Sequence, residues 1–261
     1  MPRIKLTIEY DGTDFCGWQV QPNARTVQEE LERALGELLG EAVRVEGAGR
    51  TDAGVHALGQ VACFDAQRAL PLQAYARGLN GHLPPDVAVV SAEEVEPGFD
   101  PRRWSLGKRY RYLISNRRSR SPLRRRTHWE LFGRLDVEAM CVGAGALAGR
   151  HDFAAFRAAD CEAKSSVREL RAVGLSGQAG DEIAVEIEGT AFLKHMVRNI
   201  VGTLVEVGRG KRAPGWVAGV LASKDRTQAG ATAPAHGLTL VQVLYGEGRP
   251  AHLSPPDAGD E

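Results

Sequence analysis

Strand-like and helix-like hydrophobic patterns follow one another along the first 95 residues. Their order constrains the fold more strongly than any other feature of the sequence. Ile4, Leu6 and Ile8 alternate with polar residues, which predicts a half-buried strand. Apolar residues then recur at helical spacing from Val27 to Leu38, after a capping-box sequence that begins at Thr26. Further strands are predicted over 43–45, 60–64 and 87–95, and a further helix over 72–79. The order strand, helix, strand, strand, helix, strand is typical of a ferredoxin-like unit.

The second half repeats this theme with weaker signals. Strands are predicted over 106–115, 167–175, 183–187 and 238–245, with helices over 136–147, 193–207 and 216–221. The pattern predicts an α+β protein of two ferredoxin-like (RRM-like) halves that share a mainly antiparallel sheet. We expect the first half over 1–105 and the second over 106–246. Residues 247–261, which are rich in proline and acidic residues, are expected to form a disordered tail, to which we assign no function.

Several classes of protein are disfavoured by composition. No stretch reaches the run of about 18 apolar residues that a membrane helix needs, and the N-terminus lacks the apolar segment of a secretion signal. The four cysteines are scattered and form no C-x-x-C pair, which argues against a disulfide framework and against a zinc site. We therefore expect a cytoplasmic protein with reduced thiols, no metal and no membrane association.

The net charge of zero conceals an uneven distribution. Residues 1–100 hold 8 of the 33 basic and 16 of the 33 acidic side chains, a balance of −8 that the rest of the chain offsets with +8. Eleven basic residues and no acidic one lie between Asp100 and Glu130. This basic cluster is either a solvated loop or the footprint of a polyanion partner. Nearby rings, on which nucleic-acid bases can stack, favour RNA: Trp104, Tyr110, Tyr112 and Trp129.

Residues 47–56 read GAGRTDAGVH, a loop too poor in apolar bulk to be core. A dinucleotide-binding fingerprint would need glycine where Asp52 stands and a helix where a strand follows. A phosphate-binding P-loop would need Gly-Lys-Ser/Thr at the start of a helix, which is absent. Asp52 and His56 alone are too few ligands to indicate a metal site.

Asp52 is then the chemically distinctive residue of this loop. Small neighbours let a bulky substrate approach the backbone, and Arg50 beside it favours the ionised carboxylate. Such a carboxylate can act as a nucleophile or as a general base. In the alternative interpretation, Arg50 and Asp52 only pair with each other and brace a turn.

The sequence around Asp52 resembles the active-site motif of the tRNA pseudouridine synthase A family. The resemblance continues, in order, along residues 3–245. The stretches that carry it are 10–12 (YDG), 17–19 (GWQ), 26–28 (TVQ), 49–57 (GRTDAGVHA), 108–112 (KRYRY), 151–153 (HDF), 192–202 (FLKHMVRNIVG) and 237–238 (GL).

This resemblance implies the pseudouridine synthase fold with a central active-site cleft. It also implies an isomerase that converts uridine to pseudouridine at positions 38, 39 and 40 of the tRNA anticodon stem-loop. Family members need no cofactor or metal, and they are homodimers that bind one tRNA across both subunits. The partners expected from the resemblance are therefore tRNA and a second copy of the chain.

The resemblance also assigns roles to individual residues. Asp52 matches the essential aspartate, for which attack on C1′, attack on C6 and proton abstraction from C2′ all remain open. Arg50 matches the arginine that helps to flip the target base, and Tyr110 the tyrosine that stacks on it. Arg198 matches the basic partner of the catalytic carboxylate, and Leu238 an apolar residue of the uracil pocket. His56 and His195 receive no proton-transfer role. The arginines expected to contact the tRNA backbone are Arg117, Arg118, Arg124, Arg125 and Arg126.

Three other functions are possible for this sequence, and they differ in their chemistry. A non-catalytic RNA-binding module would bind RNA independently of Asp52, although such a module has no need of that carboxylate. A pseudouridine synthase with another RNA target would keep the chemistry and change the position. A nucleotide-binding oxidoreductase is disfavoured by the broken glycine fingerprint.

Overall fold

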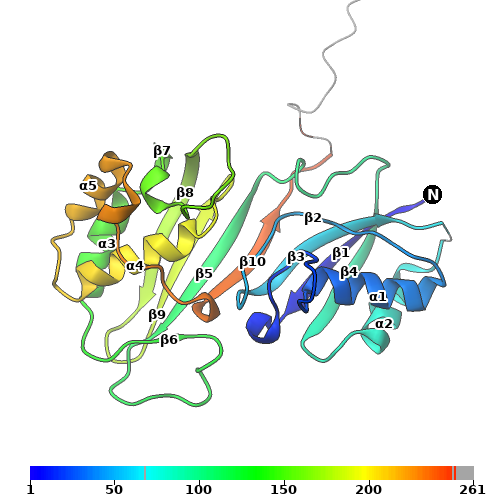
Figure 1. The fold of residues 1–261 in the computed structure, drawn as a ribbon, viewed down its shortest axis with the longest axis horizontal. Coiled ribbons are helices and arrows are strands. Elements are labelled where there is room, and N and C mark those ends of the chain that lie inside the picture. The colour runs from blue at the N-terminus through cyan, green and yellow to red at the C-terminus, as the bar shows by residue number, and fades with distance from the viewer. Residues whose placement is uncertain (68, 249, 251–261) are drawn as a thin grey trace, which may run out of the picture. The chain divides into compact units, whose positions relative to one another are not determined.

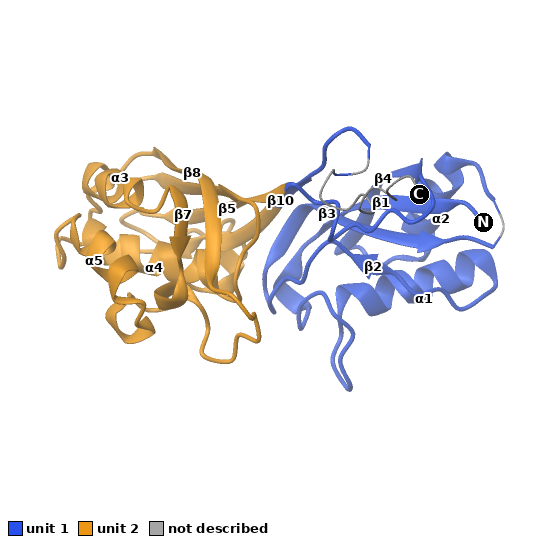
Figure 2. Cartoon of the chain, turned by 90° about the horizontal axis from the view of Figure 1, so that it is seen from above, with its two compact units in different colours: residues 1–106, 241–261 blue, residues 107–240 orange. Residues whose placement is uncertain are grey.

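The computed structural model describes residues 1–67, 69–248 and 250 of the chain (Figure 1). The chain forms two compact units, which we call unit 1 (Met1–Leu106 and Val241–Glu261) and unit 2 (Gly107–Leu240) (Figure 2). The sequence assigns the last strand to the second half, whereas this division gives the chain from Val241 onward to unit 1. Most of the tail expected to be disordered, residue 249 and residues 251–261, lies outside the described residues.

Unit 1 is a sheet with two helices, and its pairs β1/β3, β1/β4 and β2/β3 are antiparallel. Its strands run in the order β4-β1-β3-β10, in which β10 is Leu238–Leu244, and the short β2 also pairs with β3. The helices α1 and α2 pack on each other, and α2 packs on β4. The element bounds are β1 Arg3–Tyr10, η1 Gly12–Asp14, α1 Val27–Leu39, β2 Glu46–Gly47, β3 His56–Asp65, α2 Leu72–His82 and β4 Val87–Val95.

Helix α1 forms where the sequence predicts it. The Thr26 hydroxyl accepts a hydrogen bond from the backbone N–H of Glu29, and Gly40 ends the helix in the left-handed conformation at φ 76°. Leu31 and Leu35 are fully buried on one face. Each such buried side chain stabilises the fold by about 1.5–3 kcal/mol relative to an exposed one.

The predicted strand over 43–45 is wrong, although Val43 and Val45 are buried as that prediction requires. The strand β2 begins only at Glu46. The backbone N–H and carbonyl of Val45 form hydrogen bonds with side chains of α1 and not with a partner strand. Its N–H donates to Glu32 Oε1 at 3.1 Å, and its carbonyl accepts from Gln28 Nε2 at 3.2 Å. A segment satisfied in this way has no need of strand pairing.

Unit 2 contains a sheet in the order β10-β5-β9-β8-β7, with α3 packed on α4, α5 and β8. Its neighbouring pairs β5/β9, β9/β8 and β8/β7 are antiparallel, whereas the short β6 runs parallel to β5. The bounds are β5 Gly107–Ser115, β6 Trp129–Glu130, α3 Val137–Gly145, β7 Gly149–Asp152, η2 Ala154–Phe156, β8 Val167–Gly177, β9 Glu182–Gly189, α4 Met196–Gly208, α5 Trp216–Ser223, η3 Arg226–Gln228, η4 Ala235–Gly237 and β10 Leu238–Leu244.

The mixed α+β class with mainly antiparallel strands is therefore confirmed. The helix predicted over 193–207 begins at Met196, because His195 adopts a left-handed conformation with φ 61°. Met196, Ile200 and Leu204 lie four residues apart on one face of this helix and are buried. Within the described residues, none of the helices combines the length and apolar content that a membrane span requires.

Candidate active site

The loop that carries Asp52 connects β2 to β3 in unit 1. Asp52 is half-buried, Arg50 is exposed and Thr51 between them is buried. Backbone bonds hold the loop on both sides of the carboxylate. The Trp18 N–H donates to the Thr51 carbonyl at 3.1 Å, and the Gly54 N–H donates to the Phe15 carbonyl at 3.2 Å. Asp52 is thus presented from a backbone that is fixed by the segment after β1.

Two glycines of that segment allow this close approach. A Cβ on Gly12 would lie 2.0 Å from the Val55 carbonyl oxygen, so any larger residue would displace the loop. A Cβ on Gly17 would lie 2.6 Å from the Thr51 carbonyl oxygen, and its φ of +95° also favours glycine. The YDG and GWQ stretches are therefore the packing surface of the Asp52 loop.

A buried hydroxyl pair adds a side-chain anchor. Tyr10 Oη lies 2.8 Å from Thr51 Oγ1. Burial raises the pKa of the Tyr10 phenol well above its usual value, so the hydroxyl stays neutral and able to donate. This bond joins β1 to the residue immediately before Asp52.

His56 has a structural place beside the same loop. The backbone N–H of Gly12 lies 3.0 Å from His56 Nδ1, which must accept because the amide can only donate. The contact of that nitrogen with Asp11 Oδ1 at 3.1 Å would need a proton on Nδ1. The hydrogen bond from the Gly12 N–H is the better defined of these two contacts, and it requires Nδ1 to be an acceptor. That His56 takes no part in proton transfer stays a prediction.

Unit 2 holds the three other residues that the resemblance assigns to the site. Tyr110 of β5 is 8% exposed, and its ring meets Phe192 edge-on at 4.9 Å. Arg198 lies in the first turn of α4, where its Nε donates to the Ala233 carbonyl at 2.8 Å. Leu238 is the first residue of β10 and is buried.

The segment before β10 connects Arg198 to Leu238. The Tyr112 hydroxyl donates to the Pro234 carbonyl at 2.8 Å, and Gly237 packs directly on the Tyr112 ring. Burial raises the pKa of Tyr112, and the positive charge of Arg198 acts in the opposite direction. Tyr110 lies two residues away on the same side of β5. In unit 2, Tyr110, Arg198 and Leu238 therefore lie on neighbouring elements. Arg50 and Asp52 belong to unit 1.

Some members of the basic cluster form ion pairs, and the loop between β5 and β6 also holds members that are exposed. Arg109 pairs with Glu188 at 2.8 Å and Arg111 with Glu186 at 2.6 Å, both across β5 and β9. Arg124 pairs with Asp181 at 2.9 Å and anchors the loop between β5 and β6. Exposed members of that loop are Arg117, Arg118, Arg120, Arg125 and Arg126.

Three of the four rings expected to stack on bases are buried, because Tyr112 and Trp104 are buried as well as Tyr110. Tyr112 is fully buried, and Trp104 is buried against Phe99 at a centroid distance of 4.9 Å. These two rings therefore do not support the RNA interpretation.

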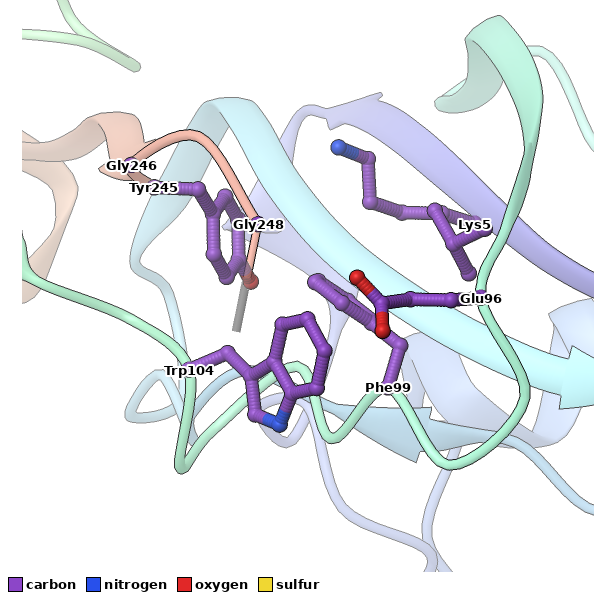
Figure 3. A pocket seen from close by; sticks show the side chains of 8 residues that line it. Lys5, Glu96, Phe99, Trp104, Tyr245, Gly246 and Gly248 are labelled. Atoms are coloured by element: carbon purple, nitrogen blue, oxygen red, sulfur yellow. The ribbon is translucent and has the colours of Figure 1, made fainter. Parts of the chain in front are cut away.

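A hollow of about 180 Å³ lies elsewhere in unit 1 (Figure 3). The rings of Phe99, Trp104 and Tyr245 line it together with Lys5 and Glu96. The Lys5 ammonium lies 5.1 Å from the centre of the Tyr245 ring and pairs with Glu93 at 2.8 Å. The predicted site residues are not among those lining this hollow. Among the described residues, no group of three or more histidine, cysteine or acidic side chains is placed to hold a metal.

Comparison with known proteins identifies the family. A family model described as tRNA pseudouridine synthase matches residues 6–102 and 144–246. The chain belongs to the tRNA pseudouridine synthase family. The matched stretches contain Arg50, Asp52, Arg198 and Leu238, whereas Tyr110 and the basic loop lie between them.

Individual relatives agree with this assignment over nearly the whole chain. The tRNA pseudouridine synthase A of Myxococcus xanthus is 64% identical over 251 residues, covering 96% of this chain and 95% of the relative. The protein of the same name from Geotalea daltonii is 50% identical over 245 residues, covering 94% of this chain and all of the relative. The Methylobacterium protein of that name is 49% identical over 251 residues, covering 96% of this chain and all of the relative.

Proposed function

We propose that this protein is an isomerase that converts uridine to pseudouridine at positions 38, 39 and 40 of the tRNA anticodon stem-loop. The observation that carries the proposal is Asp52, held on a fixed backbone among small residues within a stretch that matches the family model. A carboxylate presented in this way is suited to act on a base that has been flipped out of its stack.

The reaction balances without an added redox or energy source. The bond between N1 of uracil and C1′ of the ribose breaks, and a bond between C5 and C1′ forms. C5 loses its hydrogen and N1 gains one, so no electrons are transferred overall. Asp52 serves this exchange as the nucleophile at C1′ or C6, or as the base at C2′.

The other site residues support the same uridine in this proposal. Arg50 is exposed beside Asp52 and is available to occupy the position that the flipped base leaves. Tyr110 offers a ring for stacking, and Leu238 an apolar wall. Arg198 takes the role of the basic partner of the catalytic carboxylate. The enzyme acts in the cytoplasm as a homodimer, which would offer two copies of the +8 half of the chain to one tRNA.

Mapping the product tests the position. A tRNA transcript with uridines at 38, 39 and 40 is incubated with the protein, and pseudouridine is located at single-nucleotide resolution by carbodiimide adducts that stop reverse transcriptase. We expect stops at these positions and none in a transcript that carries cytidine there. Pseudouridine found only elsewhere would assign the chemistry to another RNA target.

The exposed arginines of the loop between β5 and β6 should govern salt dependence. The variant with Arg117, Arg118 and Arg125 all changed to Gln should weaken tRNA binding and reduce the slope of log K against log salt by about 2–3, because each phosphate contact releases counterions. Filter binding between low and moderate salt measures this slope. Arg44→Gln, which removes an 83%-exposed guanidinium from unit 1, is the control and should leave it unchanged. An unaltered slope in the triple variant would exclude these three residues from the interface; for the paired Arg124 we expect a smaller effect.

Tyr10→Phe should lower both stability and activity. Losing the bond to Thr51 should reduce the free energy of unfolding by about 1 kcal/mol, and loosening the residue before Asp52 should slow turnover. Tyr245→Phe is the matched control, because its hydroxyl donates to the Pro101 carbonyl at 2.6 Å away from the Asp52 loop. Denaturant unfolding should show similar losses for both variants, with slower pseudouridine formation in Tyr10→Phe alone. Equal activity in the two would remove the hydroxyl pair from the site.

A further inference from the structure

A polar network in unit 2 ties the segment 229–234 to helix α4. At its centre is Arg226, in the 3-10 helix η3. Its Nη2 donates to Asn199 Oδ1 and to Thr232 Oγ1, each at 3.1 Å, and its Nη1 donates to the Gly230 carbonyl at 2.9 Å. The two ends of one guanidinium therefore bind a residue of α4 and two residues of the segment.

Asn199 is oriented by the same network. Its side chain is fully buried, and its Nδ2 donates to the Phe156 carbonyl at 2.8 Å. Its Oδ1 also accepts from Thr232 Oγ1 at 2.7 Å. Because a buried amide is costly to leave unpaired, these bonds fix which way the side chain points.

A second connection lies one turn further along α4. Thr203 Oγ1 donates to the Asn199 carbonyl at 2.8 Å and accepts from the Gly230 N–H at 3.0 Å. Gly202 allows the close approach, since a Cβ there would lie 1.7 Å from the Ala231 carbonyl oxygen. The segment thus lies against the backbone of α4 and has no room to slide along it.

The hydrogen-bond acceptors around Arg226 indicate that it contributes to the geometry of the network more than to stability. The acceptors named above are neutral oxygens, and burial lowers the pKa of its guanidinium. A partly buried cation held by neutral groups contributes less to stability than an ion pair would. The planar guanidinium of Arg226 contributes more to geometry than to stability, because it holds several acceptors in place at once.

The held segment also carries a hydrogen-bond partner of Arg198. The Ala233 carbonyl accepts from Arg198 Nε at 2.8 Å, and the Ala233 N–H donates to the Arg198 carbonyl at 3.1 Å. Ala233 directly follows Thr232, one of the residues that Arg226 binds. A displacement of Thr232 would therefore move the oxygen that orients the Arg198 guanidinium.

We propose that Arg226 is a positioning residue for the isomerisation: through Asn199 and Thr232 it fixes the Ala233 carbonyl, which in turn fixes the orientation of Arg198. This inference rests on the proposed function, in which Arg198 takes the role of the basic partner of the catalytic carboxylate. Arg226 touches neither the substrate nor the carboxylate in this account, and it acts only through the segment.

The effect is measured as the single-turnover rate of pseudouridine formation with enzyme in excess over tRNA. Because misplacement by about 1 Å can cost about 100-fold in rate, we expect Arg226→Gln to reduce the rate by about 10-fold to 100-fold. The Kd for tRNA should stay within about twofold, since the segment orients Arg198 and adds no RNA contact. Arg209→Gln, which removes an exposed guanidinium of the same unit, is the control and should retain the wild-type rate.

A pair of variants at Thr232 separates positioning from a change in charge. Thr232→Val keeps the shape and removes the hydroxyl that links Arg226, Asn199 and the segment, whereas Thr232→Ser keeps the hydroxyl. We expect Thr232→Val to lose rate as Arg226→Gln does, and Thr232→Ser to restore it to within about twofold of wild type. These variants also test the network if Arg226→Gln fails to fold.

A double-mutant cycle with Arg198→Lys decides whether Arg226 acts through Arg198. Lysine lacks the Nε that binds Ala233, so Arg226→Gln should cost no further rate in that background, within about twofold. Rate losses that multiply in the double variant, or wild-type rates in Arg226→Gln and Thr232→Val, would overturn the inference. If the wild-type protein itself forms no pseudouridine, the proposed function fails, which is a different result.

Discussion

Asp52→Asn is expected to reduce the rate of pseudouridine formation by at least about 10,000-fold, because removal of a catalytic nucleophile or base has effects of this size. Asparagine has nearly the same shape as aspartate and is neutral, so it can neither attack carbon effectively nor take up a proton. The fixed backbone around residue 52 should survive the change, since its bonds to Trp18 and Phe15 involve main-chain atoms. We therefore expect the Kd for tRNA to change by no more than a few-fold.

Single-turnover assays and filter binding on the same preparation measure both quantities. Asp65→Asn is the control in unit 1, because that carboxylate is 53% exposed and pairs with Arg3 outside the Asp52 loop. It should retain the wild-type rate. Loss of tRNA affinity together with rate in Asp52→Asn would give Asp52 a structural role, and an unchanged rate would place the chemistry on another residue.

Gly202→Ala is expected to have the largest effect on stability. Alanine favours a helix interior by about 1 kcal/mol over glycine, but the added Cβ would lie 1.7 Å from the Ala231 carbonyl oxygen. Either α4 or the segment 229–234 must move, and overpacking of this kind costs about 3 kcal/mol. The net loss in unit 2 should be about 2 kcal/mol, which lowers Tm by about 4–8 °C.

Gly219→Ala provides the matched control for a helical glycine. A Cβ at this position in α5 would meet nothing within 4 Å, so only the helix preference acts. We expect it to stabilise the protein by up to about 1 kcal/mol. Calorimetry of the two variants measures the difference, and a Tm for Gly202→Ala raised as far as that of Gly219→Ala would show that the segment gives way at no cost.

Elements specified by neighbouring residues were predictable from the sequence. Thr26 and Gly40 mark the ends of α1 through local capping geometry, and Asp136 caps α3 in the same way. The glycines at 177 and 180 adopt positive φ in the turn that joins the antiparallel strands β8 and β9. Such signals lie within a few residues of the structure they determine.

Features that depend on distant partners were not predictable in this way. Val43 and Val45 have a strand pattern, yet Gln28 and Glu32 satisfy the backbone of Val45. The short strands β6 and β7 are too brief to show a period. Within the site, the motif around Asp52 identified the carboxylate, whereas its anchor Tyr10 lies 41 residues from Thr51 in sequence. Arg226 lies 27 residues from Asn199 and carries no motif.

The most direct test of the central claim is tritium release from tRNA whose uridines are labelled at C5. Isomerisation replaces the hydrogen on C5 with the bond to C1′, so the wild-type protein should release tritium to water in proportion to the pseudouridine formed. Release of tritium would establish substitution at C5 and support catalysis by this protein. Tight binding of the same tRNA without any release would contradict the account and favour a non-catalytic RNA-binding module.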